Sequence, residues 1–429
     1  MAICRPFPRH DARGVIHLAV CIFIASLWAI VANRVDAQDW PQTLGPDRDG
    51  QAPVKVEFAA WPSELKPTWT ANLGSGYAGP AVSGNQALAL HRTNRQEILT
   101  AIDLATGKTL WDCAWSTTFQ PSYNPDGGPR CVPTIRDSGT AKAVAICYGA
   151  AGDLTCVRLS DGKLLWHREL RKEFEADDGY FGAGAAPLVM GDQIIVCLGG
   201  RNAGIVAVAA ESGATRWSAT NYEASYASPI AIRDSLALVV TRLHTVLVDV
   251  SSGQVRAEIP FGSRGPTVNA STPISVGDNR YLLTASYGVG ATLLEIQNDT
   301  LTPIYRGKDL LASQYNTPVQ LGSVVLGIHG REDVGVAALR AIDPIEQQIL
   351  WEEPGFGTAH LIGVGKRALS LGIDGQLTLI DATAAGYRAQ QEANLPKGLY
   401  RALPALIGKT LLVRSHDGNN GRLMRFDLP

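Results

Sequence analysis

Five tyrosine and arginine side chains occupy the same place relative to a proline that follows three residues later. They are Tyr77, Arg130, Tyr226, Tyr315 and Arg401. Tyr and Arg are the residues most enriched at binding hot spots, since each joins a large contact area to hydrogen-bonding groups. We expect the five residues to ring the mouth of a central channel, and one interpretation is that they recognise another molecule. The alternative interpretation is that the tyrosines only cap the ends of strands.

Two long segments, 112–130 and 170–182, add aromatic side chains that we expect on the same face of the molecule. Long loops on a rigid scaffold commonly carry binding function. The aromatic residues in the two segments include Trp115, Phe119, Tyr123, Tyr180 and Phe181. We add Trp115 and Tyr123 to the five residues above as the candidate binding site.

No pattern in the chain predicts a metal site or a catalytic group. The sequence has no Cys-x-x-Cys pair, which zinc sites commonly use. His91, His329 and His416 fall at matching places in their repeats, but the three repeats are not all neighbours. We expect His416 to lie on an exposed rim turn.

Five cysteines lie beyond the first 37 residues, and their redox state stays open at this point. They are Cys113, Cys131, Cys147, Cys156 and Cys197. Cys113 with Cys131, or Cys147 with Cys156, could form a disulfide in an oxidising compartment. Buried free thiols in strands are the alternative.

The candidate site residues belong to a repeated architecture, marked by a sequence motif that recurs about every 46 residues. Clear copies are AIDLATGKTLW at 101–111, CVRLSDGKLLW at 156–166 and AVAAESGATRW at 207–217. A fixed period of this size indicates a stack of supersecondary units. Asp103 and its equivalents recur once per period, so we interpret them as turn-forming residues.

Each period contains short apolar runs, such as QALALH and AVAICY, and a Gly-containing turn. These features indicate four antiparallel strands and no helical periodicity. Eight periods predict an all-β fold, an eight-bladed β-propeller of four-stranded antiparallel blades.

The two ends of the chain complete the last blade. The eighth copy, RFDLP at 425–429, stops before a Trp strand, and KPTWTANL at 66–73 supplies the missing strand. We therefore predict a lead-in segment at 38–64 and a propeller at 65–429 that the N-terminal strand closes. The tryptophans that we expect to pack between blades are Trp69, Trp111, Trp166, Trp217 and Trp351.

The phrase AIDLATGKTLW resembles the tryptophan-docking repeat of quinoprotein (PQQ-like) propellers. The chain as a whole resembles eight-bladed, non-enzymatic members: the propeller lipoprotein of the barrel-assembly machinery, and secreted PQQ-like repeat proteins that open with a stretch like DWPQTLGPDRDG at 39–50. The resemblance implies that each Trp ring packs on the Gly turn of the next blade. It also implies pyrroloquinoline quinone with calcium as the cofactor of the enzymatic branch. The adjacent cysteines and the set of calcium ligands of that branch have no match here, so we expect no cofactor.

The first 37 residues have the pattern of a signal peptide. Arg5, Arg9 and Arg13 precede an apolar stretch at 15–32, and Val35-Asp36-Ala37 fits the small-residue cleavage rule. An uncleaved anchor is the alternative, since about 18 apolar residues can span a bilayer. We expect a periplasmic or otherwise extracytoplasmic protein that is not an integral membrane protein once the signal is removed.

The charge of the chain also limits its partners. The net charge is −2, and no Lys/Arg cluster interleaves with aromatics, which argues against nucleic-acid binding. We expect an exported scaffold, more a binding protein than an enzyme, that recognises another envelope or secreted protein through its loop-rich face. A quinone-dependent dehydrogenase-like protein, or one that binds or processes glycans, is the alternative.

Overall fold

The computed structural model describes residues 39–53, 56–122, 126–233, 235–265, 267–383, 385–417 and 420–429. The predicted signal peptide lies outside these residues. Residues from Gln38 to Pro429 form one compact unit. None of the helices that the structure describes has the length and apolar run that a bilayer crossing requires.

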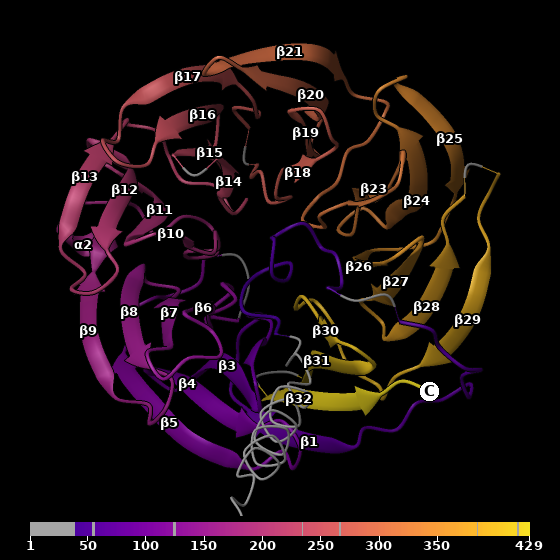
Figure 1. Ribbon diagram of the computed structural model, residues 1–429, viewed down its shortest axis with the longest axis horizontal. Helices are drawn as coiled ribbons and strands as arrows, with labels where there is room; N and C mark the ends of the chain where they lie inside the picture. Colours follow the sequence, from indigo (N-terminus) through magenta and orange to yellow (C-terminus); the bar gives the residue numbers. More distant parts are fainter. Residues whose placement is uncertain are drawn as a thin grey trace, which may run out of the picture. The chain divides into compact units, whose positions relative to one another are not determined.

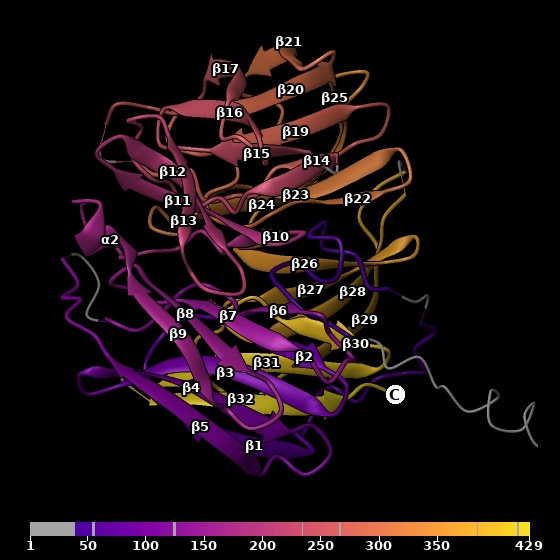
Figure 2. The same ribbon diagram turned by 60° about the vertical axis from the view of Figure 1, so that its left-hand side comes forward.

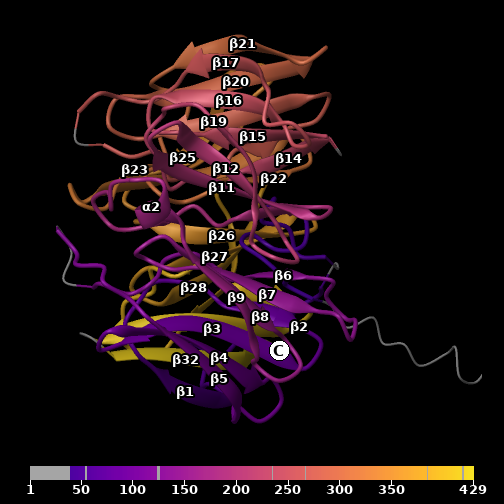
Figure 3. The same cartoon turned by 90° about the vertical axis from the view of Figure 1, so that its left-hand side faces the viewer.

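The described residues form eight four-stranded antiparallel sheets, arranged as blades around a central channel (Figure 1). This confirms the predicted eight-bladed β-propeller. In the side views, the strands run across the thickness of the ring (Figures 2 and 3). Closing a sheet-built structure into a ring leaves few unpaired edges.

Within each blade the strands are given from the channel outward. Blade 1 contains β2 (Ala81–Ser83), β3 (Gln86–Thr93), β4 (Gln96–Asp103) and β5 (Thr109–Ser116). Blade 2 contains β6 (Thr134–Arg136), β7 (Val144–Tyr148), β8 (Asp153–Arg158) and β9 (Leu164–Glu169), which is followed by the short helix α2 (Leu170–Glu173). Blade 3 contains β10 (Leu188–Met190), β11 (Gln193–Gly200), β12 (Ala203–Ala209) and β13 (Thr215–Ala219). Blade 4 contains β14 (Ile230–Arg233), β15 (Leu236–Val240), β16 (His244–Asp249) and β17 (Val255–Pro260).

The second half of the ring repeats this order. Blade 5 contains β18 (Ile274–Ser275), β19 (Arg280–Ala285), β20 (Gly290–Gln297) and β21 (Thr300–Gly307). Blade 6 contains β22 (Val319–Leu321), β23 (Val324–Arg331), β24 (Val336–Asp343) and β25 (Gln348–Glu353). Blade 7 contains β26 (Ala359–Val364), β27 (Arg367–Gly372), β28 (Gln376–Asp381) and β29 (Ala389–Asn394). Blade 8 contains β30 (Ala405–Ile407), β31 (Thr410–Asp417), β32 (Asn420–Asp427) and β1 (Trp69–Leu73).

The burial of each strand follows its place in the blade. The middle strands lie between neighbouring blades, so both of their faces are covered; all residues of β12 and β15 are buried. This explains their continuous apolar runs. The outermost strands expose one face, as the alternating burial of β29 illustrates.

The ring is closed by the pairing of β1 with β32, where Trp69 lies opposite Arg425 and Leu73 opposite Gly421. The predicted closure is therefore confirmed. Because successive strands are antiparallel, the connections between blades all lie on one face of the ring. We call it the loop face, and we call the other face, which carries the Gly turns, the turn face.

Tryptophans of the outer strands join each blade to the next. The indole Nε1 atoms of Trp69, Trp111, Trp166, Trp217 and Trp351 donate hydrogen bonds to the backbone oxygens of Leu104, Leu159, Ala210, Val250 and Thr383. The first four rings also contact the turn glycines Gly107, Gly162, Gly213 and Gly253 of the following blade. In the turn of blade 7, Gly386 does not contact a tryptophan, and the ring of Trp351 lies beside that of Tyr387, with ring centroids 6.2 Å apart.

Residues 39–53 of the lead-in segment enter the central channel, where Figure 1 shows the indigo trace. We call this stretch the channel plug. Its backbone exchanges hydrogen bonds with Val82 of blade 1, Ile135 of blade 2 and Gly363 of blade 7. Gln51 Nε2 donates to the backbone oxygen of Gln320 in blade 6. The plug therefore pairs with innermost strands whose channel-facing edges have no neighbouring strand.

Arg48 anchors the channel plug to blades 3 and 4. Its guanidinium donates to the backbone oxygens of Ala186 (3.1 Å), Pro187 (2.8 Å) and Pro229 (2.8 Å). The side chain is buried, and burial lowers the pKa of Arg48 to about 9. A buried cation that donates to backbone oxygens of two blades holds those blades at a fixed separation.

Candidate functional site

The channel opens at the loop face into a cavity of about 470 Å³. This size suits a small molecule or a few peptide residues. We call it the mouth cavity. Every blade contributes to its wall, in chain order through Tyr77, Arg130, Phe181, Tyr226, Thr272, Tyr315, His360 and Arg401.

All five Tyr and Arg residues that the proline spacing singled out line the mouth cavity. Two guanidinium groups lie close to the ring of Tyr77. The Cζ atom of Arg130 is 5.4 Å and that of Arg401 5.9 Å from the ring centroid. Cations this close to an aromatic ring are attracted by its quadrupole, so Tyr77 helps to fix both arginines.

A hydrogen-bonded network holds the side of the cavity formed by blades 6 and 8. Arg401 forms an ion pair with Glu332, and the Tyr315 hydroxyl donates to Glu332 Oε2 at 2.6 Å. Burial, and then this hydrogen bond, raises the pKa of Tyr315. The phenol therefore stays protonated and oriented at physiological pH.

Tyr226 fixes the second long loop to the wall of the cavity. Its hydroxyl accepts a hydrogen bond from the backbone N–H of Phe181 at 2.9 Å, and the two ring centroids are 5.9 Å apart. Beyond Tyr226 lies a recess of about 390 Å³, which also contacts Tyr180 and Arg242. The mouth cavity and this recess share Tyr226 and Val268, so they are adjacent on the loop face.

Three buried hydroxyl groups form an arc on the cavity wall. Each belongs to the residue before a blade-opening proline and accepts a hydrogen bond from a backbone N–H of the preceding blade. The bonds run from Ala186 to Ser228 Oγ (3.0 Å), from Ser228 to Thr272 Oγ1 (3.2 Å) and from Thr272 to Thr317 Oγ1 (3.1 Å). The sequence analysis did not identify this arc, although a Ser or Thr directly before the proline in three successive repeats could have indicated it.

The channel plug supplies the floor of the cavity. Thr43 of the plug lines the cavity and is itself buried. The plug is held near the turn face, where Asp39 accepts a hydrogen bond from the backbone N–H of Gly84 at 2.8 Å. Because the plug lies on the turn-face side of the mouth cavity, the cavity opens toward the loop face.

The two remaining residues of the predicted site have different outcomes. Trp115 lies in strand β5 and not in a loop. It is buried, and its Nε1 donates to Glu97 Oε2 at 3.2 Å. Its expected place in a binding loop is therefore wrong, because the outer strand continues further than the sequence pattern indicated. Tyr123 lies outside the described residues.

The histidines do not come together as metal ligands. Within the described ranges, no three His, Cys, Asp or Glu side chains could hold a metal ion jointly. His416 is buried in β31, with its ring centroid 4.7 Å from that of Tyr77. The expected exposed rim turn at His416 is wrong, because β31 extends through this residue. All five cysteines are buried free thiols.

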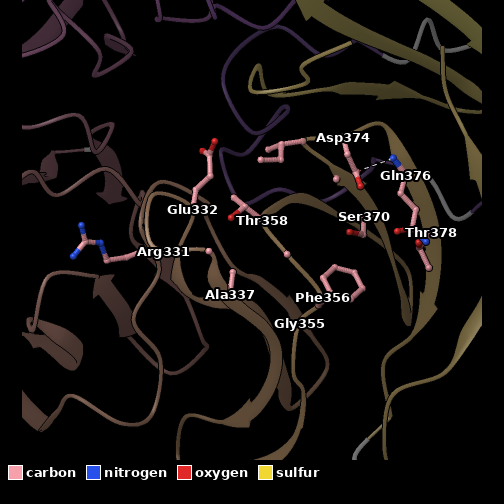
Figure 4. Close-up of a pocket in the computed structure, with 14 residues that line it drawn as sticks. Arg331, Glu332, Ala337, Gly355, Phe356, Thr358, Ser370, Asp374, Gln376 and Thr378 are labelled. Atoms are coloured by element: carbon pink, nitrogen blue, oxygen red, sulfur yellow. Dashed lines mark hydrogen bonds between the residues drawn. The ribbon is translucent and has the colours of Figure 1, made fainter. Parts of the chain in front are cut away.

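A smaller cavity of about 230 Å³ lies between blades 6 and 7 on the loop face. Figure 4 shows Thr358, Ser370 and Thr378 around it, with Arg331 extending away from them. Glu332 lines both this cavity and the mouth cavity. The network around Glu332 therefore forms part of the wall between the two.

Solved structures with this fold include a BamB protein and two dehydrogenases. BamB from Moraxella catarrhalis has a TM-score of 0.60 at 18% identity, over 84% of this chain and 97% of that one. Quinohemoprotein alcohol dehydrogenase from Comamonas testosteroni has a TM-score of 0.65 at 14% identity, over 93% of this chain and 82% of that one. A europium-containing methanol dehydrogenase has a TM-score of 0.64 at 12% identity, over 92% of each chain. These likenesses show the fold alone.

The family assignment comes from a separate match to the sequence. No curated protein sequence matches the chain. A family model described as outer membrane protein assembly factor BamB matches residues 94–353, which is more than half of the chain. The chain therefore belongs to the family of the outer membrane protein assembly factor BamB.

Proposed function

We propose that this chain is an exported scaffold that binds a segment of another envelope protein in the mouth cavity. The observation that carries the proposal is the make-up of that cavity: all eight blades contribute to it, and its Tyr and Arg side chains are held by hydrogen bonds and ring contacts. Preorganised aromatic and Arg groups are the usual anchors of protein recognition. The family description, an assembly factor of the outer membrane, supports a partner in the envelope.

The loop face around the cavity supports a protein partner over a small molecule. The recess beyond Tyr226 extends the concave surface toward the second long loop. Together the two hollows offer a partner segment an anchor point and a flanking groove. Loops placed on a rigid ring are where binding residues are commonly found.

The quinone-dependent alternative does not fit the residues at the cavity. The carboxylates that line it are those of Glu332 and Asp333, which form ion pairs with Arg401 and Arg331. Carboxylates engaged in this way are poor candidates for calcium ligands. The proposed binding function needs no cofactor. Titration of the protein with pyrroloquinoline quinone and calcium, followed by absorbance, tests the alternative directly.

Capture of the partner by cross-linking, from an envelope fraction of the source cell, tests the proposal. The double variant Tyr226→Ala, Tyr315→Ala removes two anchors and should lower capture about 10-fold or more. The matched control Lys108→Ala, Lys163→Ala changes the turn face and should leave capture intact. Loss of capture by the control alone would place the partner on the other face and overturn the proposal.

A second variant tests the same cavity without removing a wall contact. Ala270→Trp places a large side chain at a residue that lines the mouth cavity, and should block capture while every hydrogen bond of the wall remains. Ala105→Trp, at an exposed turn-face residue, is its control. If capture survives the filling of the cavity, the partner binds elsewhere.

A further inference from the structure

Arg130 is a cation on the cavity wall that forms no ion pair with a residue the structure describes, although the charge of Asp126 acts on it. Among the described residues, no Asp or Glu oxygen lies within the 4.0 Å of an ion pair from its guanidinium, whereas Arg401 is paired with Glu332. The hydrogen bonds of Arg130 go to two backbone oxygens, Gly128 O at 3.0 Å and Asp126 O at 3.4 Å. Its remaining N–H groups are available to a ligand.

Two aromatic rings lie beside the Arg130 guanidinium. Its Cζ atom is 5.4 Å from the Tyr77 ring centroid and 5.7 Å from that of Phe181. Two rings in this arrangement stabilise the charge without neutralising it. The N–H groups of a guanidinium lie in its plane, so its edge donates hydrogen bonds and suits a planar, bidentate acceptor.

The arc of hydroxyls adds further donors to the same cavity. Ser228, Thr272 and Thr317 each accept a backbone hydrogen bond, and their own O–H groups have no acceptor among the described residues. A hydroxyl whose oxygen is already engaged by an N–H has its proton left to donate. The arc thus offers donors to a ligand rich in oxygen acceptors.

From these observations we infer that the mouth cavity binds a peptide carboxylate, which the edge of Arg130 and the hydroxyl arc receive. Apolar wall residues such as Val132, Val268 and Leu403 suit the apolar atoms that flank the carboxylate. The inference rests on the proposed function and gives the chemistry of the segment that the partner inserts. Both a chain end and an acidic side chain carry this group.

Isothermal titration with short peptides separates these sources. The probes are acetyl-Ala-Ala-Leu with a free terminal carboxylate, the same peptide as its C-terminal amide, and acetyl-Ala-Glu-Ala amide. The free acid should bind at least about 10-fold more tightly than its amide, since a charge-assisted bidentate contact is lost in the amide. Tight binding of the glutamate peptide instead would assign the carboxylate to a side chain.

Variants of Arg130 test which group receives the carboxylate. Arg130→Gln should abolish the preference for the acid over the amide, and Arg130→Lys should restore part of it because the charge returns. Arg158→Gln, on the turn face, is the matched control and should keep the full preference. Thermal melting of each variant checks that the ring is intact, and the lysine variant keeps the test valid if the glutamine variant is unstable.

Two outcomes would overturn the inference. One is equal binding, or no binding, of the acid and amide peptides; the other is a glucuronate affinity that matches the acid peptide, which would make an acidic sugar the ligand. If the cavity-filling variant Ala270→Trp still blocks capture of the protein partner, the proposed function stands whichever of these two outcomes is observed. The experiments therefore distinguish a wrong assignment of the ligand as a carboxylate from a wrong assignment of the mouth cavity as the binding site.

Discussion

Trp217 and Gly253, which belong to successive blades, are in direct contact: a Cβ atom placed on Gly253 would lie 2.6 Å from the indole ring. Gly253 also has φ of 73°, a conformation that favours glycine. We therefore expect Gly253→Ala to lower the free energy of unfolding by about 1–3 kcal/mol. Urea denaturation measures this loss. Gly277→Ala, at an open turn with a similar φ, should cost less, because no atom contacts the added Cβ.

The docking tryptophans should differ in their contribution to stability according to their burial. Trp217 is 9% exposed, whereas Trp166 is only half-buried. We expect Trp217→Ala to cost about 3–5 kcal/mol, the usual penalty for truncating a buried aromatic residue. Trp166→Ala should cost about 2 kcal/mol, since part of its ring already contacts water. Equal losses in denaturant titrations would contradict this ranking.

Removal of residues 65–75 should open the ring. It deletes β1 and leaves the edge of β32 unpaired, where Trp69 to Leu73 now lie opposite Arg425 to Gly421. An unpaired strand edge templates association between molecules. We expect a lower melting temperature and aggregation in light scattering. A truncated protein that stays monodisperse and melts normally would show that closure by this strand is not needed in solution.

Glu97 should make stability depend on pH. Its carboxylate is completely buried between blades 1 and 2, where it accepts hydrogen bonds from Trp115 Nε1 and the backbone N–H of Ala150 (2.7 Å). Burial, opposed by the Ala150 hydrogen bond and aided by the charge of nearby Asp153, raises the pKa of Glu97 from 4.5 to about 7. The stability linked to this proton is fully present below pH 4.5 and is lost as the pH rises through about 7.

The variant Glu97→Gln isolates this effect from the other titrating groups. Its amide cannot ionise, so the variant should gain stability relative to the unmodified protein as the pH rises from 5 to 8. The difference in melting temperature between the two proteins, measured at both pH values, checks the sign. Asp161→Asn is the control and should show no such dependence, because the hydrogen bond from Arg158 lowers the pKa of the Asp161 carboxyl to about 2, far below this range.

Arg48 should contribute to stability by bracing blades 3 and 4 from the channel plug. Arg48→Ala leaves the backbone oxygens of Ala186, Pro187 and Pro229 without their donor, which should cost about 2–4 kcal/mol. Asp47→Ala, at the exposed neighbouring residue, should change the free energy of unfolding by less than about 0.5 kcal/mol. Similar values for the two variants, measured by chemical denaturation, would mean that the plug does not brace the ring.

The parts of the molecule that repeat could be predicted from the sequence. The recurring motif that ends in Trp located the blades. The fixed spacing to a following proline placed Tyr77, Tyr226 and Tyr315 together at the mouth of the channel, because equivalent residues of each repeat occupy equivalent places in the ring. His416 and Trp115 were misplaced because polar residues and a loop-like composition concealed how far β31 and β5 extend. Their burial depends on the adjacent blade, which no local pattern reveals.

The role of residues 39–53 could not be read from the sequence at all. Arg48 and Gln51 bind backbone oxygens of distant blades. Every residue type has a backbone oxygen, so the sequence does not show which residues accept these hydrogen bonds. The hydroxyl arc was hidden for a related reason, since Ser and Thr before a proline are common in ordinary turns. In both cases the partner is the main chain.

The channel plug also constrains the order in which the chain can fold. Its partners lie in blades 1, 2, 3, 4, 6 and 7, and the segment just after it meets the far end of the chain, where the backbone N–H of Ala59 donates to Pro429 O at 2.9 Å. Contacts of such sequence separation form late, because a long loop must close first. A chain that is synthesised from its N-terminus therefore contains residues 39–53 before any of the blades they bind, and β1 stays unpaired until β32 of blade 8 has been made.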